Sequence, residues 1–305
     1  MRRSKRLLVR ATADTDDKFF RSKSVKCEES TISAELTKPL KSSEPSHCLA
    51  SVTNHNITCC LTTQDRIIRF GKIPPQIAKH IEIIEQIRVK ADAPVDTMGC
   101  HMLADKNAEP KVYRFQILVA LMLSSQTKDE VVSAAMERLK ACGCSIDWVL
   151  GVSREELAKL ICPVGFYKRK AEYLQRTAAI LRERHADDIP DTIEALTALP
   201  GVGPKMGHLV LQIAFDKSVG IGVDTHVHRI ANRLGWVHTR TPNETETRLR
   251  QILPRNEWRS INKLLVGFGQ QTCRPVNPRC ADCLNREFCP SATSASLSIP
   301  NKKKE

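Results

Sequence analysis

Two glycines and a lysine in the segment Leu199-Pro-Gly-Val-Gly-Pro-Lys205 form a pattern that could hold a phosphate group. Glycines one residue apart permit positive φ and let the backbone approach a ligand closely. Backbone N–H groups beside a helix N-terminus favour an anion. Gly201, Val202 and Gly203 are therefore candidate phosphate ligands in a helix–hairpin–helix, a pattern of DNA-binding proteins. A short interhelical turn that binds nothing is the structural alternative.

Four cysteines near the C-terminal end have the spacing of a metal site. Cys273, Cys280, Cys283 and Cys289 offer four soft ligands within seventeen residues. This spacing suits a tetrahedral zinc ion or a cubane iron–sulfur cluster, and spacing alone does not choose between them. Tying both ends of the first interval to one metal would also hold Arg274 and Arg279 outward, which suits contacts with phosphate.

The net charge of the chain indicates the chemical class of its partner. The formal charge of the 305-residue chain is +13, which indicates a polyanion, either nucleic acid or an acidic membrane surface. No apolar run approaches the roughly 18 residues of a membrane span, so we expect a soluble protein. Charge alone does not choose between the two polyanions, and we expect nucleic acid and no membrane as the partner. The other eight cysteines are scattered from Cys27 to Cys162, and no secretory leader is evident, so reduced thiols are expected.

The N-terminal segment is basic and lacks helical periodicity. Residues 1–13 hold five basic residues and no acid. They are typical of a mitochondrial transit peptide, a nuclear-targeting segment or an ordinary basic tail, and these alternatives stay open. Residues 14–72 are rich in Ser, Thr, Lys and Glu, which predicts disorder for the whole segment 1–72.

Periodic apolar residues beyond position 73 predict helices. Helical spacing begins after Pro74–Pro75 and continues, past an expected loop over 91–110, into segments ending at Ser124–Ser125, over Asp129–Ala141 and over Lys170–Arg184. Ser153 and Glu156 form a capping box. Asp191 could cap a helix through Leu199, and Lys205 begins another that runs to about Phe215. Alternation with period two is nowhere sustained, so the predicted fold is all-α.

Taken together, several motifs resemble the endonuclease III family, especially its animal members. They include the hairpin segment 199–205, Val-Asp-Thr-His-Val-His-Arg at 223–229 and the cysteine spacing. Segments 123–129, 165–171 and 267–273 fit the same family. The resemblance runs from roughly Ala93 to Pro290. Gly207 and Gly222 stand where alanine is usual, and we expect them to loosen the helix after Lys205 and the approach to Asp224.

The resemblance implies two helical domains on either side of a DNA-binding cleft, and a [4Fe–4S] cluster rather than zinc. Residues 109–217 would form the six-helix domain with the helix–hairpin–helix. Residues 74–108 and 218–292 would form the cluster domain, and 293–305 a C-terminal tail.

The implied activity is that of a bifunctional DNA glycosylase and apurinic/apyrimidinic lyase in base-excision repair. Such an enzyme flips oxidised pyrimidines out of duplex DNA, cleaves the N-glycosidic bond through a lysine Schiff base and nicks the strand by β-elimination. Lys205 would be the nucleophile, since a helix N-terminus and desolvation both disfavour its ammonium form. The alternative for Lys205 is a phosphate-binding lysine. Asp224 would stabilise the cationic sugar and help activate the nucleophile, and it also resembles a helix N-cap.

Three further residues are candidates for DNA contact. Gln126 resembles the family's wedge, which fills the space that a flipped base leaves, although it could be a solvated loop side chain. Lys168 and Lys170 are candidate phosphate contacts, although a solvated basic face explains them equally well. His226 and His228 are interpreted as helix residues, structural or near the pocket.

The alternatives come from two classes of protein. The adenine-mismatch glycosylase lacks a lysine at the position of Lys205 and carries a large C-terminal domain, whereas sixteen residues follow Cys289. The 8-oxoguanine branch has the lysine and generally lacks the cluster. A noncatalytic DNA-binding module would need neither Lys205 nor Asp224. The expected partners are damaged double-stranded DNA and downstream repair proteins, the expected state is a monomer, and the expected location is nucleus or mitochondrion.

Overall fold

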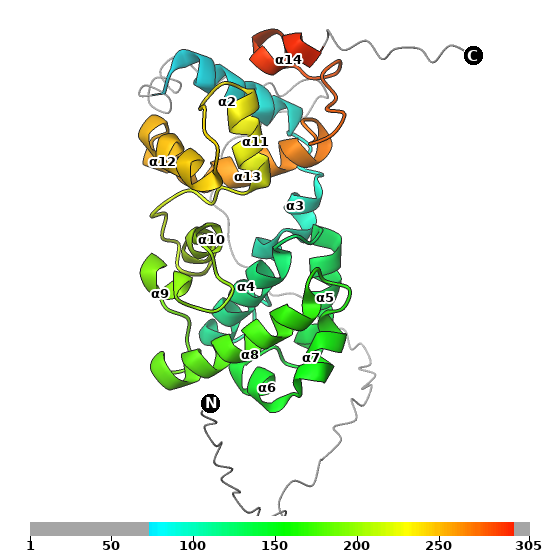
Figure 1. The fold of residues 1–305 in the computed structure, drawn as a ribbon, viewed down its shortest axis with the longest axis vertical. Helices are drawn as coiled ribbons and strands as arrows, with labels where there is room; N and C mark the ends of the chain where they lie inside the picture. The colour runs from blue at the N-terminus through cyan, green and yellow to red at the C-terminus, as the bar shows by residue number, and fades with distance from the viewer. Residues whose placement is uncertain (1–72, 296–305) are drawn as a thin grey trace, which may run out of the picture. The chain divides into compact units, whose positions relative to one another are not determined.

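The computed structural model describes residues 73–295, and within that range every regular element is a helix (Figure 1). The predicted all-α class is thereby confirmed. None of the described helices is long and apolar enough to cross a membrane. The predicted disorder and targeting signals of residues 1–72 lie outside the described residues, as does the end of the chain beyond 295. All described residues belong to one compact unit.

The first hydrophobic core is built by seven consecutive helices, and Figure 1 shows them from teal-green to yellow-green. It contains buried residues from Leu103 to Leu211, and α10 packs on α4 while α8 packs on α6 and α7. This core carries the hairpin segment between α9 and α10. Its helices are α4 (Pro110–Ser124), α5 (Asp129–Ala141), α6 (Ile146–Gly151), α7 (Arg154–Ile161), α8 (Tyr167–Arg184), α9 (Ile193–Thr197) and α10 (Pro204–Ala214).

The second hydrophobic core joins the start of the described chain to its end. It brings together α2 (Pro75–Ile87), α11 (Thr225–Arg233), α12 (Pro242–Ile252) and α13 (Arg255–Gln271), with three of the four clustered cysteines packed against it. Ile81, Ile84 and Ile261 are completely buried there. The cysteine segment continues through η2 (Arg286–Phe288) to α14 (Pro290–Ala295).

The predicted loop over 91–110 is wrong in part, because this segment contains α3 (Pro94–Met98) and the short 3₁₀ helix η1 (Cys100–Met102). Pro94 occupies the first helical turn, and the carboxylate of Asp96 accepts the N–H of Ala93 at 3.0 Å. The element is too short to be stable alone, so tertiary contacts maintain it. Leu103 and Ala104 already belong to the first core, ahead of the boundary expected at Glu109.

Two helix starts also differ from the prediction. α9 begins at Ile193 rather than after Asp191, because the Thr192 hydroxyl caps it by accepting the N–H of Ala195. Asp191 instead accepts a hydrogen bond from Lys217 at 2.5 Å. Lys170 lies within the first turns of α8, which begins at Tyr167. The capping box of Ser153 and Glu156 at the start of α7 is confirmed.

Candidate functional site

Lys205 and Asp224 line the same cavity, which has a volume of about 1030 Å³. Lys205 is the second residue of α10 in the first core, and Asp224 is the N-cap of α11 beside the second core. Residues from α3, the turn between α4 and α5, and α13 complete the walls. The cavity therefore collects an amine and a carboxylate from parts of the chain that are buried in different cores.

One of the two glycines before Lys205, Gly201, has the positive φ that the sequence allows, whereas Gly203 has extended backbone. Gly201 has a φ of +78°, and a Cβ atom there would lie 2.5 Å from the ring of Tyr173. Gly203 is the N-cap of α10, and open space surrounds the position that its Cβ would take. Val202 is buried and anchors the turn through its N–H, which donates to Leu199. Gly201 is thus required by the close approach of Tyr173, whereas Gly203 faces open space.

Asp224 is held by its own helix and by the segment that leads to it. Its Oδ1 accepts the N–H of Val227 at 2.8 Å, so the predicted N-cap is confirmed. The amide of Asn262 on α13 donates to the carbonyl of Gly222 at 2.5 Å. A carboxylate has a second oxygen and further lone pairs, so capping leaves acceptor capacity toward the cavity.

The two glycines that depart from the family pattern fill a packing role. A Cβ on Gly207 would lie 2.5 Å from Cδ1 of Ile193, and a Cβ on Gly222 would lie 2.7 Å from Leu209. Neighbouring side chains therefore occupy the space that alanine methyl groups would need. The expected loosening is accordingly offset by close packing of larger side chains against both glycines.

Asp129 and His226 add two titratable groups to the cavity, and sequence reasoning did not give Asp129 a role. Burial raises the pKa of the Asp129 carboxyl, while the hydrogen bond from Gln270 opposes that rise. Burial also lowers the pKa of His226, and the charge of Asp224 opposes this shift. Lys205 acts electrostatically on both groups, which places all four in one electrostatic neighbourhood. The family motif at 123–129 ends on Asp129, which was the available signal.

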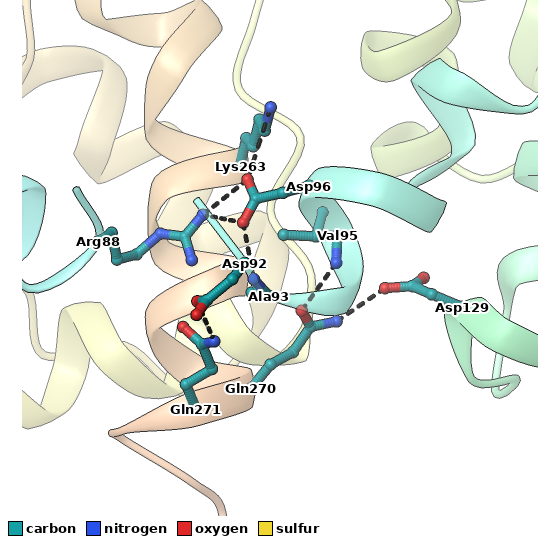
Figure 2. Close-up of polar contacts among 9 residues, drawn as sticks. All are labelled: Arg88, Asp92, Ala93, Val95, Asp96, Asp129, Lys263, Gln270 and Gln271. Atoms are coloured by element: carbon teal, nitrogen blue, oxygen red, sulfur yellow. Dashed lines mark hydrogen bonds and ion pairs between the residues drawn. The ribbon is translucent and has the colours of Figure 1, made fainter. Parts of the chain in front are cut away.

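Gln270 connects the cavity wall to α3, as Figure 2 shows. Its side-chain oxygen accepts the N–H of Val95 at 3.0 Å, and its amide nitrogen donates to Asp129 at 2.7 Å. The base of this network is an ion pair between Arg88 and Asp96, with side chains only 5% and 4% exposed. Because the Gln270 amide is bonded at both its oxygen and its nitrogen, it helps to fix the orientation of the Asp129 carboxylate.

Gln126 lies on the rim of the cavity in the turn between α4 and α5. It is exposed and has a φ of +51°. Phe166 is a second exposed residue in left-handed backbone, with a φ of +56° and a side chain 66% exposed. The two turns touch, because the N–H of Gly165 donates to the Thr127 hydroxyl at 3.1 Å. Sequence reasoning missed Phe166, since an aromatic residue before a helix carries no signal of exposure.

The two lysines of the α8 start have different environments. Lys168 is exposed and remains a candidate for a phosphate contact. Lys170 is 6% exposed, and its ammonium donates to the carbonyls of Leu123 and Ser125 at 2.7 and 2.6 Å. The interpretation of Lys170 as a phosphate contact is therefore corrected, because its donors point into the protein.

The four clustered cysteines surround one small cavity of about 30 Å³ in the second core. All four are free thiols. Cys273, Cys280 and Cys289 each raise the pKa of Cys283, after the larger effect of its burial. Among residues 73–295, no three Cys, His, Asp or Glu side chains are close enough to count as a group for a single metal ion.

Two arginines of α11 hold the start of the cysteine segment. Arg229 donates to the carbonyl of Cys273 at 2.8 Å, and Arg233 donates to the carbonyl of Arg274 at 2.7 Å. Arg274 lines the large cavity, and within the described chain its buried Nε has no hydrogen-bond partner. Arg279 is exposed at the other end of the loop. Arg279 also lines the thiol cavity, whereas Arg274 does not.

Known proteins of similar sequence and fold define the class of this protein. Residues 119–255 match the model of the HhH-GPD superfamily of base excision DNA repair proteins. A solved non-covalent endonuclease III–DNA complex aligns with a TM-score of 0.64 and 29% identity, over 72% of this chain and 97% of that one. A trapped endonuclease III–DNA covalent intermediate aligns with a TM-score of 0.63 and 27% identity over the same shares.

Sequence relatives are more similar still. The endonuclease III-like protein 1 of Gallus gallus is 53% identical over 221 residues, which cover 72% of this chain and 79% of that protein. The endonuclease III homolog of Schizosaccharomyces pombe is 46% identical, over 77% and 68% of the two chains. The chain belongs to the endonuclease III family, as its motifs indicated.

Proposed function

We propose that this protein is a bifunctional DNA glycosylase and lyase that removes oxidised pyrimidines from duplex DNA. Membership of the family supports the coarser role, a DNA glycosylase of base-excision repair. The observation that carries the finer proposal is the shared cavity of Lys205 and Asp224, beside a hairpin suited to phosphate. A relative trapped as a covalent intermediate with DNA supports a covalent step.

Lys205 would supply the nucleophile. Its amine attacks C1′ of the damaged nucleotide, and the base leaves with the electron pair of the N-glycosidic bond. The amine loses a proton and the sugar ring opens, which gives an imine between Lys205 and C1′. Loss of a C2′ proton then expels the 3′ phosphate, which nicks the strand.

Asp224 would stabilise the positive charge that develops on the sugar as the base leaves. A fixed carboxylate is effective at this task, because its orientation needs no rearrangement during reaction. The N-cap bond to Val227 provides that fixed orientation. Asp224 would also accept a proton from the attacking amine, so capping and catalysis use different lone pairs of one side chain.

DNA would lie across the hairpin and the cavity mouth. The backbone N–H groups of Gly201 and Gly203, together with Lys168, Arg274 and Arg279, would bind phosphates. The predicted phosphate contact of Val202 is corrected, because its N–H donates to the carbonyl of Leu199. Gln126 would fill the space left by the flipped base, with Phe166 beside it as a second wedge. Extruding the base costs a few kcal/mol, which wedges in the duplex help to offset.

Cys273, Cys280, Cys283 and Cys289 would hold a [4Fe–4S] cluster. Their four free thiols around one cavity are a donor set that suits iron. When bound, the cluster would tie both ends of the Arg274–Arg279 loop to α13 and so present that loop to phosphate. The domain boundaries predicted from sequence also remain proposals, although two separate buried cores support them.

Incision of a duplex that carries one thymine glycol tests the function. We expect a strand break with purified protein and none with Lys205→Gln, while both proteins bind the duplex. An undamaged duplex of the same sequence is the control. Binding without incision by the wild-type protein would favour a noncatalytic DNA-binding module. Release of unmodified adenine from a mismatched duplex, without release of thymine glycol, would favour the adenine-mismatch branch.

A further inference from the structure

Lys170 is a buried lysine that the proposed reaction does not use. Its three ammonium hydrogens have three acceptors: the carbonyls of Leu123 and Ser125, and the Thr127 hydroxyl at 3.2 Å. All three acceptors belong to the end of α4 and the turn that follows it. Burial lowers the pKa of Lys170 to about 8, so placing a cation here is costly.

The Lys170 ammonium lies at the C-terminal end of α4, where a positive charge is favourable. The last carbonyls of a helix have no partner within it and carry the negative end of its dipole. The last turn of α4 contains no basic residue of its own. Lys170 reaches across from α8 and supplies that charge. A long helix is thereby ended at a defined residue, directly before the turn that carries Gln126.

The same contacts fasten a second turn to the first. The Thr127 hydroxyl, which Lys170 contacts, also accepts the N–H of Gly165. A Cβ on Gly165 would lie 2.6 Å from the carbonyl oxygen of Gln126, so only glycine allows this approach. Phe166 follows at once. The two exposed side chains in left-handed backbone therefore rise from turns that Lys170 and Thr127 join.

Left-handed backbone at a glutamine or a phenylalanine persists only where surrounding contacts enforce it. Lys170 contacts the carbonyl groups that precede Gln126 and the hydroxyl that follows it. Removing its ammonium would leave at least two carbonyls without this donor. The turn would then be free to relax toward ordinary backbone, which would move Gln126 relative to Phe166.

We propose that Lys170 is a positioning residue that holds Gln126 and Phe166 as one rigid pair, which enters the duplex together when a base is extruded. The inference rests on the proposed function. It assigns Lys170 no contact with DNA and no part in bond cleavage. Its effect is confined to substrates in which a base must leave a stacked duplex.

The test compares two substrates with Lys170→Met, which keeps the length of the stem and removes the donors. One substrate is a duplex with thymine glycol opposite 2-aminopurine, and the other is a single strand with a preformed abasic site. We expect single-turnover base release from the duplex to fall about 10- to 100-fold. Cleavage of the single strand should change by less than about twofold. The rise in 2-aminopurine fluorescence on binding should be lost.

The controls separate positioning from folding. Lys159→Met removes an exposed lysine of α7 and should match the wild type on both substrates. Thr127→Val keeps the shape of the side chain and removes the shared hydroxyl, so it should give the same split to a smaller degree. If Lys170→Met fails to fold, the Thr127→Val variant tests the proposal in its place. Thermal melting should show that each variant used is folded.

Two results would overturn the proposal. The first is equal loss on both substrates, which would indicate a merely structural lysine. The second is a variant that releases the base and unstacks 2-aminopurine as well as the wild type does. If the wild-type protein is inactive on both substrates, the proposed enzymatic function is refuted, and the role of Lys170 that rests on it is refuted as well.

Discussion

The large cavity and the cysteine segment are built in opposite ways. The cavity takes Asp129 from α5, Lys205 from α10 and Asp224 from the N-cap of α11, so tertiary folding must assemble it. The four thiols come from seventeen consecutive residues and line one small cavity. Chemistry is thus distributed over two cores, whereas the proposed metal ligands are local.

One helix connects the two regions. α11 begins at the N-cap Asp224 beside the large cavity, and its later residues Arg229 and Arg233 hold the backbone of Cys273 and Arg274. The cysteine segment is therefore placed by the same element that places the proposed catalytic carboxylate. We infer that damage to the cavity should change reaction rate, while damage to the cysteine segment should change affinity.

The largest expected effect is that of Lys205→Gln. Removing the nucleophile should lower strand cleavage by on the order of 10³-fold or more, since no covalent route remains. The affinity for damaged duplex should change by less than about threefold, because glutamine keeps a long polar side chain. Single-turnover gel assays and fluorescence anisotropy measure the two quantities. A parallel loss of affinity and rate would contradict the expectation that the large cavity controls rate and the cysteine segment controls affinity.

Asp224→Asn should come next. The amide oxygen can still accept the N–H of Val227, so the cap largely survives while the charge is lost. We expect base release to fall about 10²- to 10³-fold with binding intact. A residue that only capped the helix would lose about 1 kcal/mol of stability and little activity. Chemical denaturation beside the rate measurement distinguishes these outcomes.

Cys283→Ala tests the other region. The wild-type protein should be brown and contain about four irons per chain, and the variant should lose them. Because the Arg274–Arg279 loop loses its anchor, affinity for damaged and undamaged duplex should fall together. Iron analysis of anaerobically purified protein checks the cofactor. Stoichiometric zinc with no iron in the wild type would refute the cluster.

A smaller effect is expected for Arg279→Ala. Losing one phosphate contact should weaken binding to all duplexes and make the dependence of log affinity on log salt shallower by about one. The exposed Arg184 at the end of α8 offers a matched control, whose alanine variant should keep the wild-type slope. Altered lesion preference with an unchanged slope would argue against a phosphate contact.

The smallest effect should follow deletion of residues 1–72. Every motif lies after this segment, so incision by the purified truncation should match the full chain within about twofold. A change in cellular distribution between nucleus and mitochondrion is expected instead. Lost incision in a soluble truncation would show that the segment contributes to the site.

The helices of the two cores were largely predictable because their apolar residues recur at helical spacing. α5 agrees with its predicted range, Asp129–Ala141. α3 was missed because its five residues are stabilised by contacts with distant α13, which leave no local pattern. Asp191 was preferred as a cap over Thr192 because the sequence does not show that Lys217 lies beside it.

Site residues were likewise predictable where a local backbone requirement marks them, and not where their role depends on tertiary contacts. The hairpin glycines and Asp224 were recognisable because each satisfies a local backbone requirement. Lys170 was misinterpreted because a lysine in a basic run looks solvated, and only the fold reveals the three acceptors around it. Phe166 was missed for a similar reason, because only the fold reveals that its side chain is exposed. Sequence therefore predicts where chemistry is available more readily than which way a side chain points.

The most direct test of the central claim is to locate the covalent adduct. The protein is incubated with a thymine glycol duplex and borohydride, and the trapped complex is digested and sequenced by mass spectrometry. A single adduct on Lys205, absent from Lys205→Gln, is the predicted result. An adduct of wild-type yield in Lys205→Gln, or one mapped to another amine, would contradict the assignment of the nucleophile.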